Sequence, residues 1–256
     1  MLVVVILAGH DSPPEVVGIF LAGILSAGAW GYWLEGGNRL SRPFGYYGFL
    51  FGGLGALLGL AVFDPASAAR LSAAFACGAP LAQAIGRMRC LVQGCCHGRS
   101  IEGLPGICVT NPKSRVVALS ELHGVPIHPT QLYSTISNLA IFALLLKLSV
   151  AGAPAAFVGG IYLVLSSLAR FAEEQYRGEP QTPRFLGLAV YQWLAIGTFL
   201  MGILITLLDL GPASAIGVDT NLLIPFAAGI VAAAFMSIDF PKSRRRFSRL
   251  TVGDTA

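Results

Sequence analysis

Long apolar runs separated by short polar turns dominate the chain. Helical spans are expected at about 15–34, 44–63, 70–88, 131–148, 154–171, 185–208 and 221–238. Each run approaches the roughly 20 helical residues that cross a hydrocarbon core about 30 Å thick. Residues 1–9 are too short, and lack the basic flank, for a cleaved signal peptide. The pattern predicts an all-α, polytopic membrane bundle of about seven transmembrane helices, with residues 1–256 in a single integral membrane domain.

Composition supports this class and excludes others. Hydrophobic residues make up 55% of the chain and charged residues 12%, with a mean hydropathy of +0.70. A soluble domain carries about 25% charged residues, so no separate soluble domain is expected. The net charge of +4 comes without a basic stripe interleaved with aromatics, so nucleic acid is not an expected partner. The basic tail, 242–249, is typical of a juxtamembrane end that meets anionic membrane lipids.

One connection is longer and less regular than the others. Residues 87–130 are rich in glycine, proline, cysteine and charge, and such a loop usually carries function. Cys90, Cys95, Cys96 and His97 could in principle ligate zinc, but two of the cysteines are adjacent and no second cysteine pair follows. A compact cysteine-lined turn is favoured over metal binding or a redox-active pair, and no cofactor is expected.

Two arginines lie within the predicted membrane spans, where side chains are normally apolar. Arg87 closes the third span and Arg170 closes the fifth, and a membrane arginine costs about 2.5–3.5 kcal/mol on insertion scales. Arg170 and Glu174 are spaced i,i+4 on one helix, and Glu173 and Arg177 repeat that spacing. The spacing is explained either by helix-end salt bridges or by a polar site within the bundle.

The segment that opens the fourth span favours the second explanation. His128 lies just before the helix, Pro129 fits its first turn, and Gln131 and Tyr133 project from that turn. A helix start also attracts anions through its unpaired N–H groups. Together with two arginines, it suggests a phosphate, and the phosphate found within a membrane is a phospholipid head group.

Glycines recur through the second span. They are Gly48, Gly52, Gly53, Gly55 and Gly59. Their spacing offers small faces against which another helix can pack closely, and packing alone explains them.

With these residues in order, the chain resembles the prolipoprotein diacylglyceryl transferases over roughly 44–200. The matching pieces are 44–49, 86–99, 128–133, Arg170 with Glu174 and the segment after it, and Gln192. The resemblance implies transfer of the diacylglyceryl group of phosphatidylglycerol to the lipobox cysteine thiol in preprolipoprotein signal peptides, the first step of bacterial lipoprotein maturation. It also implies an inner-membrane location.

The resemblance assigns roles to residues of this chain. Arg87 and Arg170 would bind the phosphate, with Glu174 orienting Arg170 and Tyr47 beside them as the fourth catalytic candidate. The expected substrate-binding residues are Arg99, His128, Gln131, Tyr133 and Gln192.

Two departures place the chain in a cysteine-rich, divergent branch. Tyr47 stands where the family often has a histidine proposed as a base, and a tyrosine with a pKa of about 10 is a poor base. Residues 90–95 replace an asparagine and a glutamate of the family pattern, with cysteine at both ends. Non-catalytic phospholipid binding or transport, and Cys/His thiol or metal chemistry, remain alternative functions.

Membrane orientation stays open. Seven spans and a cytoplasmic tail would place 15 of the 17 Lys and Arg residues inside, whereas the family's site faces outward. Phosphate-binding arginines distort such a count, because topology does not place them. The side of the membrane on which the tail lies is therefore not assigned.

Overall fold

The chain folds mainly into helices. The computed structural model describes residues 13–33, 45–103, 106–178 and 184–208, together with 227 and 231. The helices there are α2 (Pro13–Trp33), α3 (Tyr46–Phe63), α4 (Pro65–Gln93), α5 (Arg115–Ala118), α6 (Thr130–Val150), α7 (Ala155–Tyr176) and α8 (Val190–Thr206). Two short antiparallel pairs join β1 (Ile107–Cys108) to β2 (Pro126–Ile127) and β3 (Arg184–Phe185) to β4 (Leu188–Ala189). The expected all-α membrane bundle is confirmed.

Four of the described helices are long and apolar enough to cross a membrane: α2, α3, α6 and α7. The apolar helix α8 is shorter, at 17 residues. Helix α4 covers the expected span 70–88 but is not among these four apolar helices. It contacts α3, α6 and α7, so it can carry small and polar residues that a lipid-facing helix cannot. The expected span 221–238 and the tail 242–249 fall outside the described residues, apart from 227 and 231. The chain is a multi-pass membrane protein.

Helix α4 extends further than the sequence pattern indicated. It starts after Asp64, whose side chain accepts a hydrogen bond from Ser67 N at 3.0 Å, and it ends at Gly94 in the left-handed conformation (φ 74°). Such glycines commonly terminate helices. The segment expected to be irregular from residue 87 is therefore helical to Gln93, which places Arg87 and Cys90 at i,i+3 on one face.

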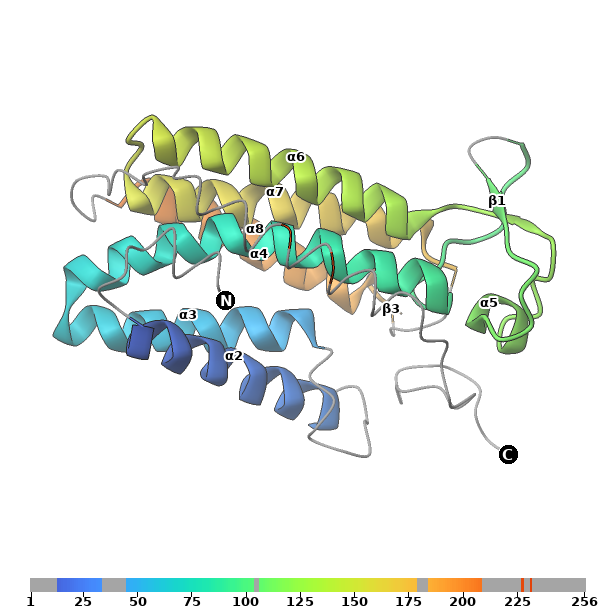
Figure 1. Ribbon diagram of the computed structural model, residues 1–256, viewed down its shortest axis with the longest axis horizontal. Coiled ribbons are helices and arrows are strands. Elements are labelled where there is room, and N and C mark those ends of the chain that lie inside the picture. The colour runs from blue at the N-terminus through green and yellow to red at the C-terminus, as the bar shows by residue number, and fades with distance from the viewer. Residues whose placement is uncertain are drawn as a thin grey trace.

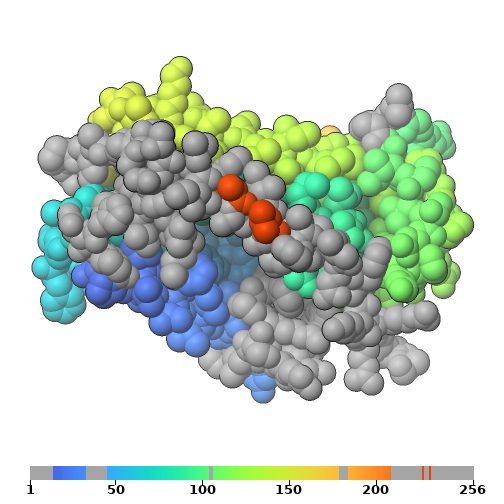
Figure 2. All heavy atoms as spheres, viewed as in Figure 1, coloured from blue at the N-terminus to red at the C-terminus, as the bar shows by residue number. Residues whose placement is uncertain are grey.

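The helices lie side by side along the long axis of the molecule (Figure 1). Helix α4 has the α2–α3 hairpin on one side and α6 with α7 on the other, and α8 packs on α7. Large buried side chains of this core include Val16, Leu71, Leu145 and Val158. Residues between α4 and α6 gather at one end of the bundle, where Figure 2 shows them as a green mass beyond the helices.

Many large apolar side chains point outward. Leu25, Val62, Phe63, Ile136 and Leu204 are all exposed. An apolar surface of this extent is unfavourable in water but matches a hydrocarbon environment. The outward faces are thus consistent with helices that meet lipid.

The glycines of α3 behave as helix-packing residues only in part. A Cβ on Gly48 would lie 2.8 Å from Ala27 Cα, and one on Gly52 would lie 2.6 Å from Ala22 O, so both face the α2 backbone. Added Cβ atoms would meet open space at Gly53, Gly55 and Gly59. The packing role is confirmed for the first two glycines alone.

Helices α7 and α8 cross at a second pair of glycines. A Cβ on Gly160 would lie 2.7 Å from Gly202 O, and one on Gly202 would lie 2.9 Å from Gly160 O. The two backbones therefore touch with no room for side chains between them. This contact sets the position of α7, which carries Arg170 and Glu173.

Gly160→Leu should destabilise the bundle by about 1–3 kcal/mol, because the new side chain must separate α7 from α8. The matched control is Gly159→Leu, one residue away, where an added Cβ meets nothing within 4 Å. Both changes raise helix propensity equally. Thermal unfolding in detergent should show a midpoint several degrees lower for the first variant only. Equal midpoints would contradict the close crossing.

Candidate functional site

A buried ion pair joins α4 to α7. Arg87 Nη2 lies 2.8 Å from Glu173 Oε1 and 3.2 Å from Glu173 Oε2, and both side chains are less than a tenth exposed. Arg177 Nε is 3.8 Å from the same Glu173 oxygen. Buried charges persist only when they are paired, so this contact ties two helices together at the functional end. The sequence singled out Arg87 but not its partner Glu173 as a site residue.

Arg170 reaches across to α4 and α3. Its Nη2 donates to Gln83 Oε1 at 2.8 Å, and its guanidinium carbon lies 4.0 Å from the centre of the Tyr46 ring. Gln83 Nε2 in turn donates to the hydroxyl of Tyr162 at 3.0 Å. A cation over an aromatic face and a side-chain amide together hold Arg170 in one orientation.

Glu174, expected to orient Arg170, lies with another arginine. Its Oε2 is 3.3 Å from Arg177 Nη1. Arg170 and Glu174 have the spacing of an intrahelical pair, yet the guanidinium points toward Gln83 on the neighbouring helix. The orientation of Arg170 by Glu174 stays a prediction, and the tertiary contact with Gln83 is the hydrogen bond that the structure gives to Arg170.

Tyr47 is buried and uses its hydroxyl as a donor. The phenol donates to Tyr191 O at 3.1 Å, and its ring stacks on Tyr191 at 5.7 Å between centroids. A phenol that gives its proton to a carbonyl is not arranged to take a proton from a substrate. The geometry suits a residue that holds the start of α3 against α8, while its neighbour Tyr46 contacts Arg170.

Three cysteines converge beside the ion pair. The Sγ atoms of Cys90, Cys95 and Cys96 all lie within 4.8 Å of one another. The start of α6 fixes the turn that carries them: Thr130 Oγ1 donates to Cys96 O at 2.6 Å, and Gln131 Nε2 donates to Cys95 O at 2.8 Å. The compact cysteine-lined turn favoured from the sequence is thus present, and no disulfide joins its cysteines in the structure.

The three thiols do not share one acidity. Hydrogen bonds from the thiols of Cys90 and Cys95 hold the pKa of Cys96 well below its ordinary value, and the charges of Arg177 and Arg87 act in the same direction. The pKa of Cys95 is raised well above its ordinary value, first by its hydrogen bond with Cys90. The electrostatics thus favour negative charge on Cys96 sulfur.

His97 does not join the thiols. The ring is fully buried, with Nδ1 2.9 Å from Gly98 O and Nε2 2.9 Å from Ser120 Oγ. Both ring nitrogens are therefore engaged in the loop that follows α4. The four-residue cluster considered from the sequence contains three converging members.

His128 and Tyr133 form an aromatic group with Tyr176 of α7. His128 Nδ1 lies 3.2 Å from the Tyr133 hydroxyl, and the His128 ring lies 4.9 Å from that of Tyr176. Burial, followed by the charge of Arg99, lowers the pKa of His128 below its ordinary value. The lowered pKa favours the neutral form of the imidazole, which forms hydrogen bonds.

The start of α6 is closed by its own turn. Thr130 N donates to His128 O, while Leu132 N and Tyr133 N both donate to Pro129 O. These hydrogen bonds occupy the N–H groups of Thr130 and Leu132, which the helix start was expected to offer to an anion. One buried acceptor remains: Gln131 Oε1 has no hydrogen-bond partner within the described part of the chain.

Gln192 is buried at the start of α8. Its Oε1 accepts from Ala189 N at 2.9 Å, and its Nε2 lies 3.5 Å from Phe171 O on α7. The side chain thus caps its own helix and links it to the helix that carries Arg170 and Glu173. This geometry describes a positioning residue.

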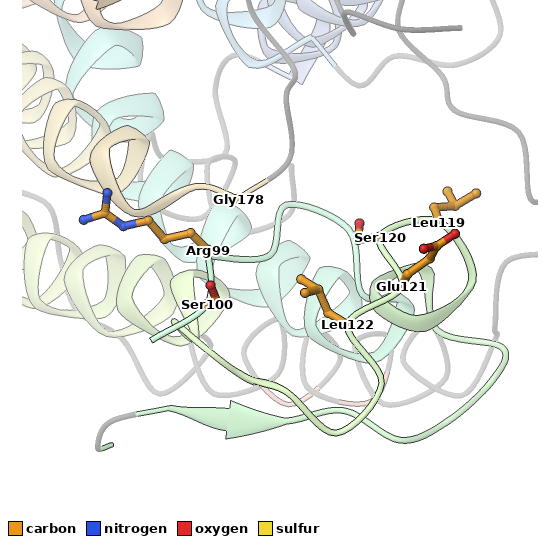
Figure 3. Close-up of a pocket in the computed structure, with 7 residues that line it drawn as sticks. All are labelled: Arg99, Ser100, Leu119, Ser120, Glu121, Leu122 and Gly178. Carbon is orange, nitrogen blue, oxygen red and sulfur yellow. The ribbon is translucent and has the colours of Figure 1, made fainter. Parts of the chain in front are cut away.

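Arg99 lies in the loop region at the end of the bundle. It borders a cleft of about 460 Å³ together with Ser100, Leu119, Ser120, Glu121, Leu122 and Gly178. In Figure 3 the Arg99 side chain points away from Ser120 and Leu122. Its backbone bridges two elements, with Arg99 N donating to Tyr176 O and Arg99 O accepting from His128 N. Arg99 is therefore near His128 without joining the Arg87–Glu173 pair.

Three residues of the site were not chosen from the sequence: Glu173, Gln83 and Tyr46. Gln83 carried a usable signal, because it is a polar residue one helical turn before Arg87 on the same face of an apolar span. Tyr46 carried none, since the family comparison pointed to the adjacent Tyr47.

Comparison with known proteins agrees with this arrangement. The family model described as prolipoprotein diacylglyceryl transferase matches residues 41–208. A phosphatidylglycerol–prolipoprotein diacylglyceryl transferase of Clostridium tetani is 30% identical over 129 residues, which is 50% of this chain and 49% of that protein. One from Tolumonas auensis is 36% identical over 97 residues, 36% of this chain and 37% of that protein.

A second clostridial relative, phosphatidylglycerol–prolipoprotein diacylglyceryl transferase 2 of Clostridium perfringens, is 31% identical over 128 residues, covering 50% of this chain and 47% of that protein. The chain thus spans about half the length of the first two relatives it matches. The family match covers the helices that carry the site, from α3 to α8. By that match, this chain belongs to the prolipoprotein diacylglyceryl transferase family.

Proposed function

We propose that this protein transfers the diacylglyceryl group of phosphatidylglycerol to the lipobox cysteine thiol of preprolipoproteins in the bacterial inner membrane. Family membership and the names of the relatives support the reaction. The observation that carries the proposal is the group of arginines at one end of the bundle, anchored by the buried Arg87–Glu173 pair.

The chemistry needs positive charge at a dry site. A thiolate attacks the glyceryl carbon, the carbon–oxygen bond to phosphate breaks, and negative charge accumulates on the departing glycerol phosphate. Preorganised guanidinium groups stabilise that charge far better inside a protein than in water. We assign this role to Arg87 and Arg170, which lie on adjacent helices and share the neighbour Glu173.

Arg170 has donors to offer a phosphate. A guanidinium carries five N–H donors, and the bond to Gln83 uses one of them. The Tyr46 ring covers one face and leaves the edge for oxygen atoms. The polar residues His128, Tyr133 and Arg99 then shape the head-group side of the site, and the unpartnered Gln131 Oε1 accepts a glycerol hydroxyl.

Glu174, Tyr47 and Gln192 take supporting roles in this proposal. Glu174 positions Arg177, Tyr47 holds α3 on α8, and Gln192 caps α8. None of these contacts places the side chain where it would accept a proton from a thiol. These contacts support a source of the thiolate other than Tyr47.

Arg87→Gln should reduce lipidation at least about 100-fold, because it removes charge that stabilises the leaving phosphate. The measurement is mass spectrometry of a reporter lipoprotein in a bacterium depleted of its own transferase. Arg70→Gln, near the other end of the same helix, is the control and should lipidate at the parental rate. Normal lipidation by the Arg87 variant would exclude the assigned site. A folded parent chain that binds phosphatidylglycerol but never lipidates the reporter would instead identify a non-catalytic binding protein.

Tyr46 and Tyr47 should respond differently to substitution. Tyr46→Leu removes the ring beneath Arg170 and should slow lipidation by about 3- to 30-fold, whereas Tyr46→Phe keeps the ring and most of the rate. Tyr47→Phe removes one hydrogen bond, so the rate should stay within about fivefold of the parent. Initial rates in vesicles test this order. A loss of 100-fold or more in Tyr47→Phe would restore Tyr47 as the base.

A further inference from the structure

We propose that Cys90, Cys95 and Cys96 bind a zinc ion whose fourth coordination position receives the thiol of the lipobox cysteine. This inference rests on the proposed function, because it concerns how the acceptor thiol is activated. It departs from the expectation that the protein binds no cofactor. That expectation rested on the spacing of the cysteines in the sequence, which does not reveal that their three sulfur atoms converge.

The geometry of the sulfur atoms suits the ion. Zinc binds thiolates at about 2.3 Å, so tetrahedral ligands lie about 3.8 Å apart. The three Sγ atoms lie within 4.8 Å of one another, so side-chain adjustments of about an ångström bring them to that spacing. Soft thiolate ligands favour zinc over hard cations such as magnesium.

The backbone holds this cluster from two sides. Cys90 is on the last turn of α4, and the left-handed Gly94 turns the chain back so that Cys95 and Cys96 face it. The side chains of Thr130 and Gln131 then donate hydrogen bonds to the backbone carbonyls of Cys96 and Cys95, respectively. Cys96 itself has a positive φ of 57°, a conformation that costs energy in a residue with a side chain and is concentrated at functional sites.

The surrounding charge balances such a complex. Three thiolates and a divalent ion carry one net negative charge. The neighbouring ion-pair network carries one net positive charge, since three guanidinium groups accompany two carboxylates. Its members are Arg87, Arg170, Arg177, Glu173 and Glu174. Compensation of this kind is what a charged site in a low-dielectric environment requires.

An open fourth position distinguishes this site from a structural one. Structural zinc sites have four protein ligands, whereas catalytic sites have three and leave one position for water or substrate. Three converging ligands are found among the described residues, and His97 is turned to Gly98 and Ser120 instead. Cys90, Cys95 and Cys96 are each only partly buried, which is consistent with access for an incoming thiol.

The position of the cluster fits the reaction. Cys90 follows Arg87 by three residues on one face of α4, so the sulfur cluster lies beside the guanidinium assigned to the phosphate. A thiol with an ordinary pKa of about 8.5 is mostly protonated at neutral pH, and coordination to zinc deprotonates it outright. The ion thus supplies the activation that Tyr47 is not arranged to give.

The step balances without an oxidant or reductant. The lipobox thiol releases its proton to water as it coordinates the ion. Its sulfur then forms a bond to the glyceryl carbon while the bond from that carbon to the phosphate oxygen breaks, and the electron pair leaves with glycerol phosphate. The thioether product is a weak ligand, so water replaces it.

Metal analysis of the full chain, purified in detergent without chelator, tests the site directly. We expect about one zinc per chain, and at least about tenfold less in Cys90→Ser, Cys95→Ser and Cys96→Ser. Cys108→Ser is the matched control, because Cys108 lies in β1 outside the cluster and should leave zinc content unchanged. A three-serine variant combines Cys90→Ser, Cys95→Ser and Cys96→Ser. Equal zinc content in the parent and in this variant would overturn the proposal, as would a disulfide among the three residues in the parent protein.

Cobalt substitution tests the fourth position. The parent loaded with Co²⁺ should show thiolate-to-metal absorption that changes when a lipobox peptide with cysteine is added, but not when its serine counterpart is added. An identical spectrum with both peptides would overturn the thiol-binding part. This readout needs no phospholipid, so it is independent of turnover.

The two proposals fail in different ways. Zinc binding and the cobalt response with no lipidation of the reporter would refute the transferase function and leave the thiol-binding metal site. Full lipidation by the three-serine variant would refute the metal's role and leave the transferase function. Both proposals are supported if lipidation is lost in the three-serine variant and in each of the three single variants, whereas Cys108→Ser still lipidates the reporter.

Discussion

The functional end of this protein depends on a buried ion pair between Arg87 and Glu173. Neither charge can be solvated within the bundle, so each requires the other, and the pair draws α4 and α7 together. Breaking such a pair leaves an uncompensated buried charge, at a cost of about 3–5 kcal/mol. Arg177 lies beside the same carboxylate and Arg170 interacts with it, so the pair also determines where the other guanidiniums lie.

The polar start of α6 is the second support of this end. Its side chains resembled a binding surface in the sequence, yet Thr130 and Gln131 hold the carbonyls of Cys96 and Cys95. Buried carbonyls without partners are costly where water is scarce, and these hydrogen bonds satisfy two of them. A motif that reads as ligand-binding can therefore act by shaping the loop that faces the ligand, while His128 and Tyr133 border the site.

The departures from the family pattern acquire a common explanation in the tertiary structure. Tyr47 stands where the resemblance to the family led us to expect a histidine, and its hydroxyl donates to Tyr191 O across to α8. The stretch 90–95 has cysteines at both ends where the resemblance led us to expect an asparagine and a glutamate, and these cysteines join Cys96 in a cluster of three sulfur atoms. One change removes a proton acceptor from the expected position, and the other assembles ligands that can activate a thiol differently.

Apolar periodicity determined the class of this protein, the approximate positions of its long helices through α8 and the two membrane arginines, because lipid-crossing segments need long uninterrupted apolar runs. It could not determine side-chain partners. Glu174 and Arg170 have intrahelical spacing, but Arg170 meets Gln83 and Tyr46, and Arg87 meets Glu173 from another helix. Cys90, Cys95 and Cys96 likewise converge only because Gly94 reverses the chain and α6 holds the turn. Sequence spacing predicts which residues are neighbours along one helix. The contacts of this site depend instead on how helices far apart in the chain pack together, and only the tertiary structure decided that packing.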